Sequence, residues 1–460
     1  MPHTKTVIQF AGAVSLLALS APGALADPTP DCNAAAGEPT ALECGVDASA
    51  TGVDALAVGT EAVANGTSTT AVGGESNATG VAATAFGWRA SATAERAHAL
   101  GHLASASGVR SLAVGEAANA AGEQSVAVGN LASADGVDAV ALGTMATATG
   151  PSTIAAGGES VANGVAATAF GWRSNASAER AHALGHLASA SGERSLAVGE
   201  AANASALESI AVGNQASADG ADAVAIGTTT TATGPSTTAV GGEAVAAGPG
   251  ATAYGWRSSA TAERAHAIGH LASASGVRSL AVGEAANASG TGAVALGNES
   301  IASGANSVAI GNGAEAVRDN QVAVGSSQST YTMAGIGSDA SRAAQSGELG
   351  VVTTDRFGNL AADYSLSAGI AGNAGLIAAN RDAIGENRGG IAAAFALDTA
   401  YVPAGERFAV SGGYGFYDDE SALGLSAAYR VSQRIQFNAG LASGVDRGET
   451  GGRVGFAASW

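Results

Sequence analysis

Six histidines lie in three copies of one motif, E-R-A-H-A-[LI]-G-H, and this spacing is the first pattern in the sequence that could do chemistry. The two histidines of each copy are four residues apart, so on a helix they would share one face and could bind a metal ion. The frequent Gly around them disfavours a helix, and we therefore expect polar contacts between chains or surface ion pairs, and no metal site. The histidines are His98, His102, His182, His186, His266 and His270.

The motif Gly-Trp-Arg precedes each histidine pair and recurs with it at a constant interval along the chain. The Trp and Arg residues of the motif directly follow a glycine, at which the chain can turn tightly. They form either an exposed platform for a ligand or a local cover for the backbone, and the sequence leaves both interpretations open. The candidate ligand-binding residues are Trp88, Arg89, Trp172, Arg173, Trp256 and Arg257.

The composition excludes several classes of function. The chain has 460 residues, of which 67 are Gly, with 13% charged residues and a formal net charge of −19. An acidic chain without a basic run is not expected to bind nucleic acid. The sequence has no Ser-His-Asp triad, no recognisable carboxylate pair and no phosphate-binding loop, so we expect a protein that is not an enzyme and needs no cofactor.

A 14-residue repeat must position these motifs. The Gly of an A-x-G motif recurs without a slip from Gly59 to Gly325, which makes twenty copies, and Ala stands again five residues after it, as at Ala64. Segments such as S-V-A-V-G alternate with the period of a strand. One such unit cannot bury a face alone, whereas stacked units pair as parallel strands about 4.8 Å apart. The repeat therefore predicts a parallel β-solenoid in which the fixed Ala residues face inward.

The N-terminal residues indicate export. Residues 1–26 combine a positively charged start, an apolar stretch and the small residues of a cleavage site, as in a secretory signal peptide. Export leads to an oxidising compartment, so Cys32 and Cys44 could form one disulfide bond in an N-terminal cap. The sequence contains no further apolar run long enough for a transmembrane helix.

A heptad pattern follows the repeat. Ile recurs every seven residues from Ile370 to Ile391, and Asn stands three residues after each of the first three, at Asn373, Asn380 and Asn387. Apolar a positions with a polar d position predict a short coiled coil whose Asn residues could set its register and oligomeric state.

The last segment alternates large apolar residues with small or polar ones between Phe408 and Trp460. Four such strands are typical of a transmembrane β-barrel, although a half-buried soluble sheet would alternate in the same way. Export and an aromatic terminal residue, Trp460, placed inside the last strand favour the barrel. Four strands cannot close a barrel and an open edge is not viable in lipid, so three chains supplying twelve strands are expected.

These features resemble the YadA-like trimeric autotransporter adhesins. The repeats, of the type Ser307-Val308-Ala309-Ile310-Gly311, resemble that family's head, and residues 361–460 resemble its membrane anchor. The resemblance implies an all-β fold with a short coiled coil: a trimeric left-handed parallel β-roll head, a coiled-coil stalk and a 12-stranded trimeric transmembrane barrel. It also implies that Asn373, Asn380 and Asn387 surround an anion such as chloride.

The expected domains are the signal peptide (1–26), the N-terminal cap (27–50), the head (51–325), a neck (326–365), the stalk (366–397) and the anchor (398–460). The resemblance implies a homotrimer in a Gram-negative outer membrane, inserted by the barrel-assembly machinery, that exports its own passenger and attaches cells to host cells, extracellular matrix, other surfaces or each other. A structural surface-layer fibre and a β-solenoid enzyme acting on polysaccharide are the alternatives. The enzyme would need an acidic cluster in a groove, and the charged residues here are scattered.

Overall fold

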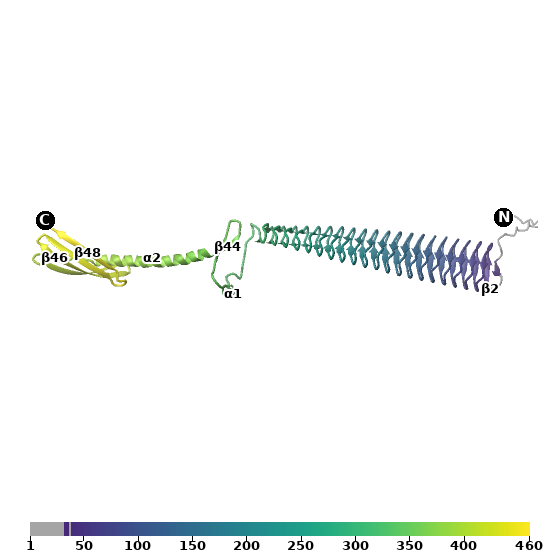
Figure 1. Cartoon of the computed structure of the whole chain (residues 1–460), viewed down its shortest axis with the longest axis horizontal. Helices are drawn as coiled ribbons and strands as arrows, with labels where there is room; N and C mark the ends of the chain where they lie inside the picture. Colours follow the sequence, from purple (N-terminus) through teal and green to yellow (C-terminus); the bar gives the residue numbers. More distant parts are fainter. Residues whose placement is uncertain (1–31, 36–37) are drawn as a thin grey trace, which may run out of the picture. The chain divides into compact units, whose positions relative to one another are not determined.

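The computed structural model describes residues 32–35 and 38–460, so the expected signal peptide lies outside the described residues. The chain divides between Thr330 and Tyr331 into two units, and some of their elements are labelled in Figure 1. None of the helices in the described part of the chain is long and apolar enough to cross a membrane.

The first unit is a parallel β-solenoid (Figure 1). Each of its coils contains one three-residue and one two-residue strand. The three-residue strands are the even-numbered ones from β4 (Leu56–Val58) to β42 (Val322–Val324), and they follow one another at the step of the sequence repeat. The two-residue strands are the odd-numbered ones from β3 (Ser49–Ala50) to β41 (Glu315–Ala316), with the same step. Equivalent residues of successive coils pair in parallel, as Ala113 does with Ala127. The predicted solenoid is confirmed.

Methyl groups fill the interior of the solenoid. The Ala two residues before each turn glycine and the Ala five residues after it face inward, and Ala127 and Ala134, for example, are completely buried. Two further inward positions per coil hold Ala, Ser or Thr, as at Ser125. Large side chains therefore lie on the outside, where they are free to contact other molecules.

Each coil makes two turns that need unusual backbone conformations. At the first turn Gly115 has φ +131°, and an added Cβ would lie 2.5 Å from the carbonyl oxygen of Gly129 in the next coil. Only glycine avoids both the strain and the overlap. The third position of both turns is left-handed even without glycine, since Arg89 and Arg96 both have φ 56°. This left-handed third position therefore recurs every seven residues, whereas the glycine with φ near +131° occurs only at the first turn of each coil.

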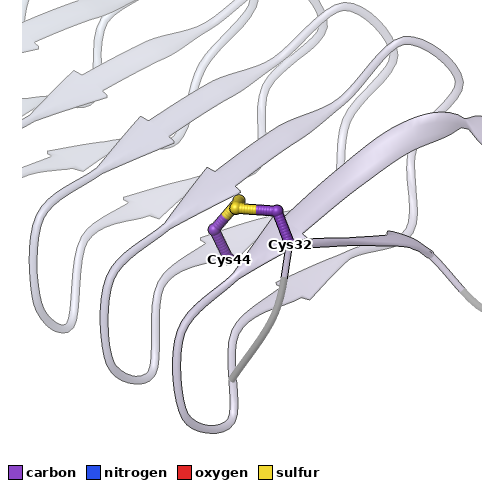
Figure 2. The surroundings of a disulfide bond; sticks show 2 residues. All are labelled: Cys32 and Cys44. Atoms are coloured by element: carbon purple, nitrogen blue, oxygen red, sulfur yellow. A yellow bond between two sulfur atoms is a disulfide. The ribbon is translucent and has the colours of Figure 1, made fainter. Parts of the chain in front are cut away.

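A hairpin covers the N-terminal end of the sheet of three-residue strands. Its strands are β1 (Asn33–Ala35) and β2 (Glu38–Cys44), and β2 continues the solenoid by pairing with β4 in the register of the repeat. A disulfide bond between Cys32 and Cys44 ties the two ends of the hairpin together (Figure 2). Because β1 pairs with the outer edge of β2, the sheet ends in a strand of only three residues, which offers little for another strand to pair with.

The second unit begins with short elements and continues into a long helix. The short elements are α1 (Asp339–Ala343) and the antiparallel strands β43 (Val351–Thr354) and β44 (Leu360–Asp363). Helix α2 (Tyr364–Ala396) follows directly, and Asp363 caps its N-terminus by accepting hydrogen bonds from the backbone amides of Ser365 and Leu366. The hydrogen bond from the hydroxyl of Ser365 lowers the pKa of Asp363 below its ordinary value, and the hydrogen bonds from the two amides lower it further by smaller amounts.

The chain ends in an antiparallel sheet of β45 (Phe408–Tyr417), β46 (Glu420–Ser432), β47 (Ile435–Gly444) and β48 (Thr450–Ala458), in that order. Its large apolar side chains are exposed on one face, and its small residues face the C-terminal part of α2. At Gly415 an added Cβ would overlap the backbone of α2, so glycine allows the close approach. The predicted alternation is confirmed, but the placement of Trp460 inside the last strand is wrong. The pairing of β48 ends at Ala458, because its partner β47 begins at Ile435.

Candidate functional site

The residues directly after the turn glycines lie one above another, one per coil, along one corner of the solenoid. In three stretches of this corner the sequence Gly, Trp, His, Glu and Asn occupies five successive coils, and we call each stretch a corner ladder. The three ladders are Gly74, Trp88, His102, Glu116 and Asn130; then Gly158, Trp172, His186, Glu200 and Asn214; then Gly242, Trp256, His270, Glu284 and Asn298.

The tryptophan of each ladder is held between two neighbouring coils. The rings of Trp88 and His102 are stacked, with their centroids 4.8 Å apart and their planes 13° from parallel. On the preceding coil Gly74 leaves room for the indole, since a Cβ there would lie 3.2 Å from Cδ1 of Trp88. Trp88 is still 43% exposed. The ring is therefore partly a cover for the backbone and partly an accessible surface.

Polar contacts extend the ladder in both directions. Nδ1 of His102 lies 3.5 Å from Oε1 of Glu116, and the side-chain amide of Asn130 donates a 3.0 Å hydrogen bond to the same carboxylate. Beside the indole, Arg89 pairs with Glu75 of the preceding coil at 3.1 Å, and its guanidinium carbon lies 5.0 Å from the indole centroid. Each exposed ion pair contributes only about 0–1 kcal/mol, so the ladder is a fixed surface pattern more than a source of stability.

The stacking and the arginine contacts recur with little change in the other two blocks. The ring centroids are 4.9 Å apart in the second block and 5.0 Å apart in the third. The recurring contacts are Trp172 with His186, Trp256 with His270, Arg173 with Glu159 at 3.0 Å, and Arg257 with Glu243 at 2.7 Å.

The opposite corner of the solenoid is less regular. Arg194 forms a 2.7 Å hydrogen bond with Glu208 of the next coil, and this bond raises the pKa of Arg194 above its ordinary value. Gln124 and Gly292 occupy the position of Glu208 in the other two blocks. This corner therefore does not present one surface three times.

The structure separates the two histidines of each motif. His102 lies in the corner ladder, whereas His98 lies on β10 (His98–Leu100), on the outer face of the sheet of three-residue strands, and pairs in register with Leu112. Within the described residues, no group of three or more His, Cys, Asp or Glu side chains of one chain is arranged to hold a metal ion. The pairs His182 and His186, and His266 and His270, are separated in the same way.

The remaining candidates lie in the second unit and in the cap. Asn373, Asn380 and Asn387 are all exposed on α2, at heptad spacing. Cys32 and Cys44 are bonded to each other, as described above. The sequence reasoning missed Gly74, Glu75, Glu116 and Asn130, although aligning the coils in the register of the repeat would have placed them beside the Trp and His residues.

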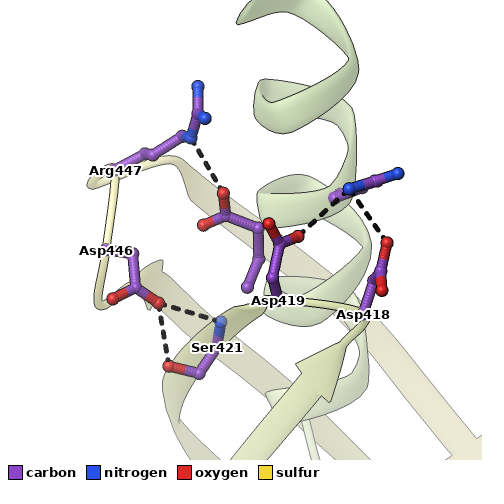
Figure 3. A network of polar contacts seen from close by, with 7 residues as sticks. Asp418, Asp419, Ser421, Asp446 and Arg447 are labelled. Atoms are coloured by element: carbon purple, nitrogen blue, oxygen red, sulfur yellow. Dashed lines mark hydrogen bonds and ion pairs between the residues drawn. The ribbon is translucent and has the colours of Figure 1, made fainter. Parts of the chain in front are cut away.

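An ionic cluster in the second unit was also missed (Figure 3). Arg388 of α2 lies 2.9 Å from Asp418 and 3.1 Å from Asp419, in the turn between β45 and β46. Arg447, after β47, pairs with the buried Glu420 at 2.8 Å, and this hydrogen bond raises the pKa of Arg447. These contacts fasten the helix and the turns of the sheet to one another at one end.

Comparisons with known proteins agree with this architecture. The model of the YadA-like membrane anchor domain matches residues 400–460. The YadA head domain repeat matches residues 50–76, 78–104, 106–132, 134–160, 162–188, 181–202, 190–216, 204–230, 232–258, 260–286, 274–300, 288–314 and 302–327. A comparison with curated protein sequences gives no significant match.

Among solved structures, the crystal structure of the collagen-binding domain of the Yersinia adhesin YadA is 27% identical to this chain. The match covers 37% of this chain and 80% of that domain, with a TM-score of 0.25, so the superposition itself carries no argument. The head and anchor matches together cover more than half of the chain. With its solenoid head and outer-membrane anchor, the protein belongs to the YadA-like trimeric autotransporter adhesins, a family of surface adhesins that are not enzymes.

Proposed function

We propose that this protein is a homotrimeric adhesin that attaches cells to host cells, extracellular matrix or other surfaces and to one another. The observation that carries the proposal is the corner ladder with the arginine beside its indole, because the same Trp, Arg, His and Glu side chains are exposed three times per chain. Six coils separate successive ladders, which corresponds to about 29 Å. Three chains multiply these sites, so that weak single contacts give strong overall attachment.

The outer faces of the two sheets of the head differ in a way that supports a trimer. The three-residue strands expose apolar side chains along the solenoid, as at Phe86, Leu142 and Ile154, which are 55%, 40% and 41% exposed. The two-residue strands expose mostly Ser, Thr and Asn. A continuous apolar face of this kind marks an association surface, and we assign two further copies of the same chain to it.

The second unit also supports an assembly of three chains. Within the described part of one chain, the sheet of β45 to β48 has an unpaired edge on each side, and three such sheets would close a barrel of twelve strands. In the trimer the α2 helices would form the coiled coil, with Asn373, Asn380 and Asn387 around an anion such as chloride. Insertion would use the barrel-assembly machinery, and the barrel would export the head to the cell surface.

Cells that display the full chain test the proposed role of the ladders. The related solved structure is a collagen-binding domain, so collagen-coated plates and plasma-treated plastic are two suitable surfaces. Replacing Trp88, Trp172 and Trp256 together by Ala should reduce attachment by about tenfold or more, because avidity falls steeply when every site weakens. Replacing Arg96, Arg180 and Arg264 on the opposite corner by Ala is the matched control, and it should leave attachment within about twofold of the wild type.

Surface display of each variant is measured with an antibody against the head. Equal attachment of the Trp variant and the wild type at equal display would contradict the role of the ladders. Attachment lost to the same extent in both variants would assign adhesion to the head in general and not to the corner ladder.

A further inference from the structure

One position on the apolar outer face of the head is interrupted by histidine at regular intervals. Three residues before the turn glycine, successive coils carry an apolar residue, as at Leu112, Val126 and Val140, or a threonine, as at Thr84, but one coil in every six carries histidine. These histidines are His98, His182 and His266. The histidines of the corner ladders stack on indoles, whereas these three lie on the face that we assign to the trimer interface.

The surroundings of His98 offer few polar partners. Leu112 lies beside it on the next coil and Thr84 on the preceding coil, in direct register, and Leu100 points outward from the same strand. When this face is covered by two other chains, an imidazole buried here needs a hydrogen-bond partner or a ligand. The Thr hydroxyl can satisfy one ring nitrogen, and the other nitrogen is left for a further partner.

Threefold symmetry supplies that partner in the proposed trimer. Three parallel chains around one axis place each residue at the same height as its two copies. The three copies of His98, each on the outer face of its own solenoid, would therefore meet around the axis as a group of three, and His182 and His266 would form two more groups farther along the head. Three neutral imidazoles with an open fourth position are a donor set that zinc binds. A second ring nitrogen bonded to a hydroxyl is the kind of contact that orients such ligands.

We propose that the trimer binds three zinc-type divalent metal ions, one at each of the layers formed by His98, His182 and His266. This inference rests on the proposed trimer, because a single chain contributes only one ligand to each site. Thr84, Thr168 and Thr252 each stand one coil before a histidine and would orient the rings. The sites would link the chains at three levels along the mostly apolar face of the head.

The test measures zinc in the full chain, extracted in detergent through an affinity tag that contains no histidine. After saturation with zinc and removal of the excess, elemental analysis should give one zinc per chain. Replacing His98, His182 and His266 together by Leu, the residue at this position in the neighbouring coil, should remove all of it. Replacing His102, His186 and His270 by Asn, a residue that the corner ladder itself carries, should leave one zinc per chain.

Two further readouts keep the outcomes distinct. Cobalt bound in place of zinc should give the visible spectrum of a four-coordinate site, and the His98→Leu single variant should lose about one third of it. Light scattering on the same samples reports the number of chains. A trimer without stoichiometric zinc, or zinc lost with the ladder histidines, would overturn this inference alone. A chain that is not trimeric in any sample would overturn the proposed assembly as well.

Discussion

Replacing Gly115 by Ala is the sharpest test of how the coils stack. This glycine has φ +131°, and its added Cβ would lie 2.5 Å from the carbonyl oxygen and 2.7 Å from the carbonyl carbon of Gly129. Backbone strain of this kind costs about 1–3 kcal/mol. Moving the next coil away would also weaken the 2.8 Å hydrogen bond from the amide of Gly129 to the carbonyl of Val114. Losing this bond costs about 1 kcal/mol more. We therefore expect a local loss of about 2–4 kcal/mol.

The loss should be local, because each coil contacts only its neighbours. Hydrogen–deuterium exchange of the full chain resolves such local opening. Since every 1.4 kcal/mol is about a tenfold change in an equilibrium, amides of the coils around Gly115 and Gly129 should exchange at least about 25-fold faster than in the wild type. Amides several coils away should be unchanged.

Gly313→Ala is the matched control. This glycine also has a positive φ, +61°, but an added Cβ would meet no atom of the described chain within 4 Å. Its position is the one at which Arg89 and other side chains adopt the same conformation, so the strain should be only about 1 kcal/mol. If Gly115→Ala and Gly313→Ala accelerate exchange equally at their own sites, the close approach of the Gly129 backbone is not the reason why position 115 needs glycine.

Three further predictions concern other parts of the chain. Among the described residues the buried hydroxyl of Ser125 has no hydrogen-bond partner, whereas that of Ser160 donates a 2.8 Å hydrogen bond to the carbonyl of Gly157. Ser125→Ala should therefore slow local hydrogen exchange and Ser160→Ala should accelerate it, because the free energy of local opening changes by about 1 kcal/mol in opposite directions. Equal effects of the two substitutions would contradict this. Gly415→Leu should block the approach of α2 and abolish heat-resistant trimers on gels, whereas Gly412→Leu, where an added Cβ approaches only one atom, at 3.8 Å, should preserve them. The folded-state pKa of Asp363 is lowered from 3.8, so its cap stabilises α2 above that pH and is lost as the pH falls through the folded pKa. Asp363→Ala should therefore accelerate exchange of the first turn at pH 7, and this difference should shrink as acid protonates the carboxylate of the wild type; a difference that does not shrink in acid would refute the capping role.

The repeat allowed most of the head to be predicted from the sequence. Its constant step fixes which Ala residues face inward, and the alternation from Phe408 onward fixes the faces of the last sheet. The left-handed turn residues carried no such signal, because Arg89, Leu103 and Glu75 occupy them as readily as glycine does. Their conformation is imposed by the hydrogen bonds between coils and not by their own preference.

The Trp, Arg and His residues of the candidate site could be picked out from the sequence, but the contacts between them could not. Trp88 and His102 were noticed as separate motifs, because they are a full repeat apart in the sequence and meet only when coils are stacked. The ion pairs of Arg388 with the turn after β45 depend on how a helix lies on a sheet, and no spacing in the sequence encodes that. Trp460 was misplaced because strand ends depend on the length of the partner strand.

The measurement that tests the central claim most directly compares cells displaying the full chain with cells displaying a variant that lacks residues 51–325. Both are brought to equal surface density, determined with a tag placed in the neck, and attachment and cell–cell aggregation are counted under flow. An adhesive head predicts that the shortened variant neither attaches nor aggregates above cells without the protein. Attachment that is unchanged by the loss of the head would contradict the proposed function.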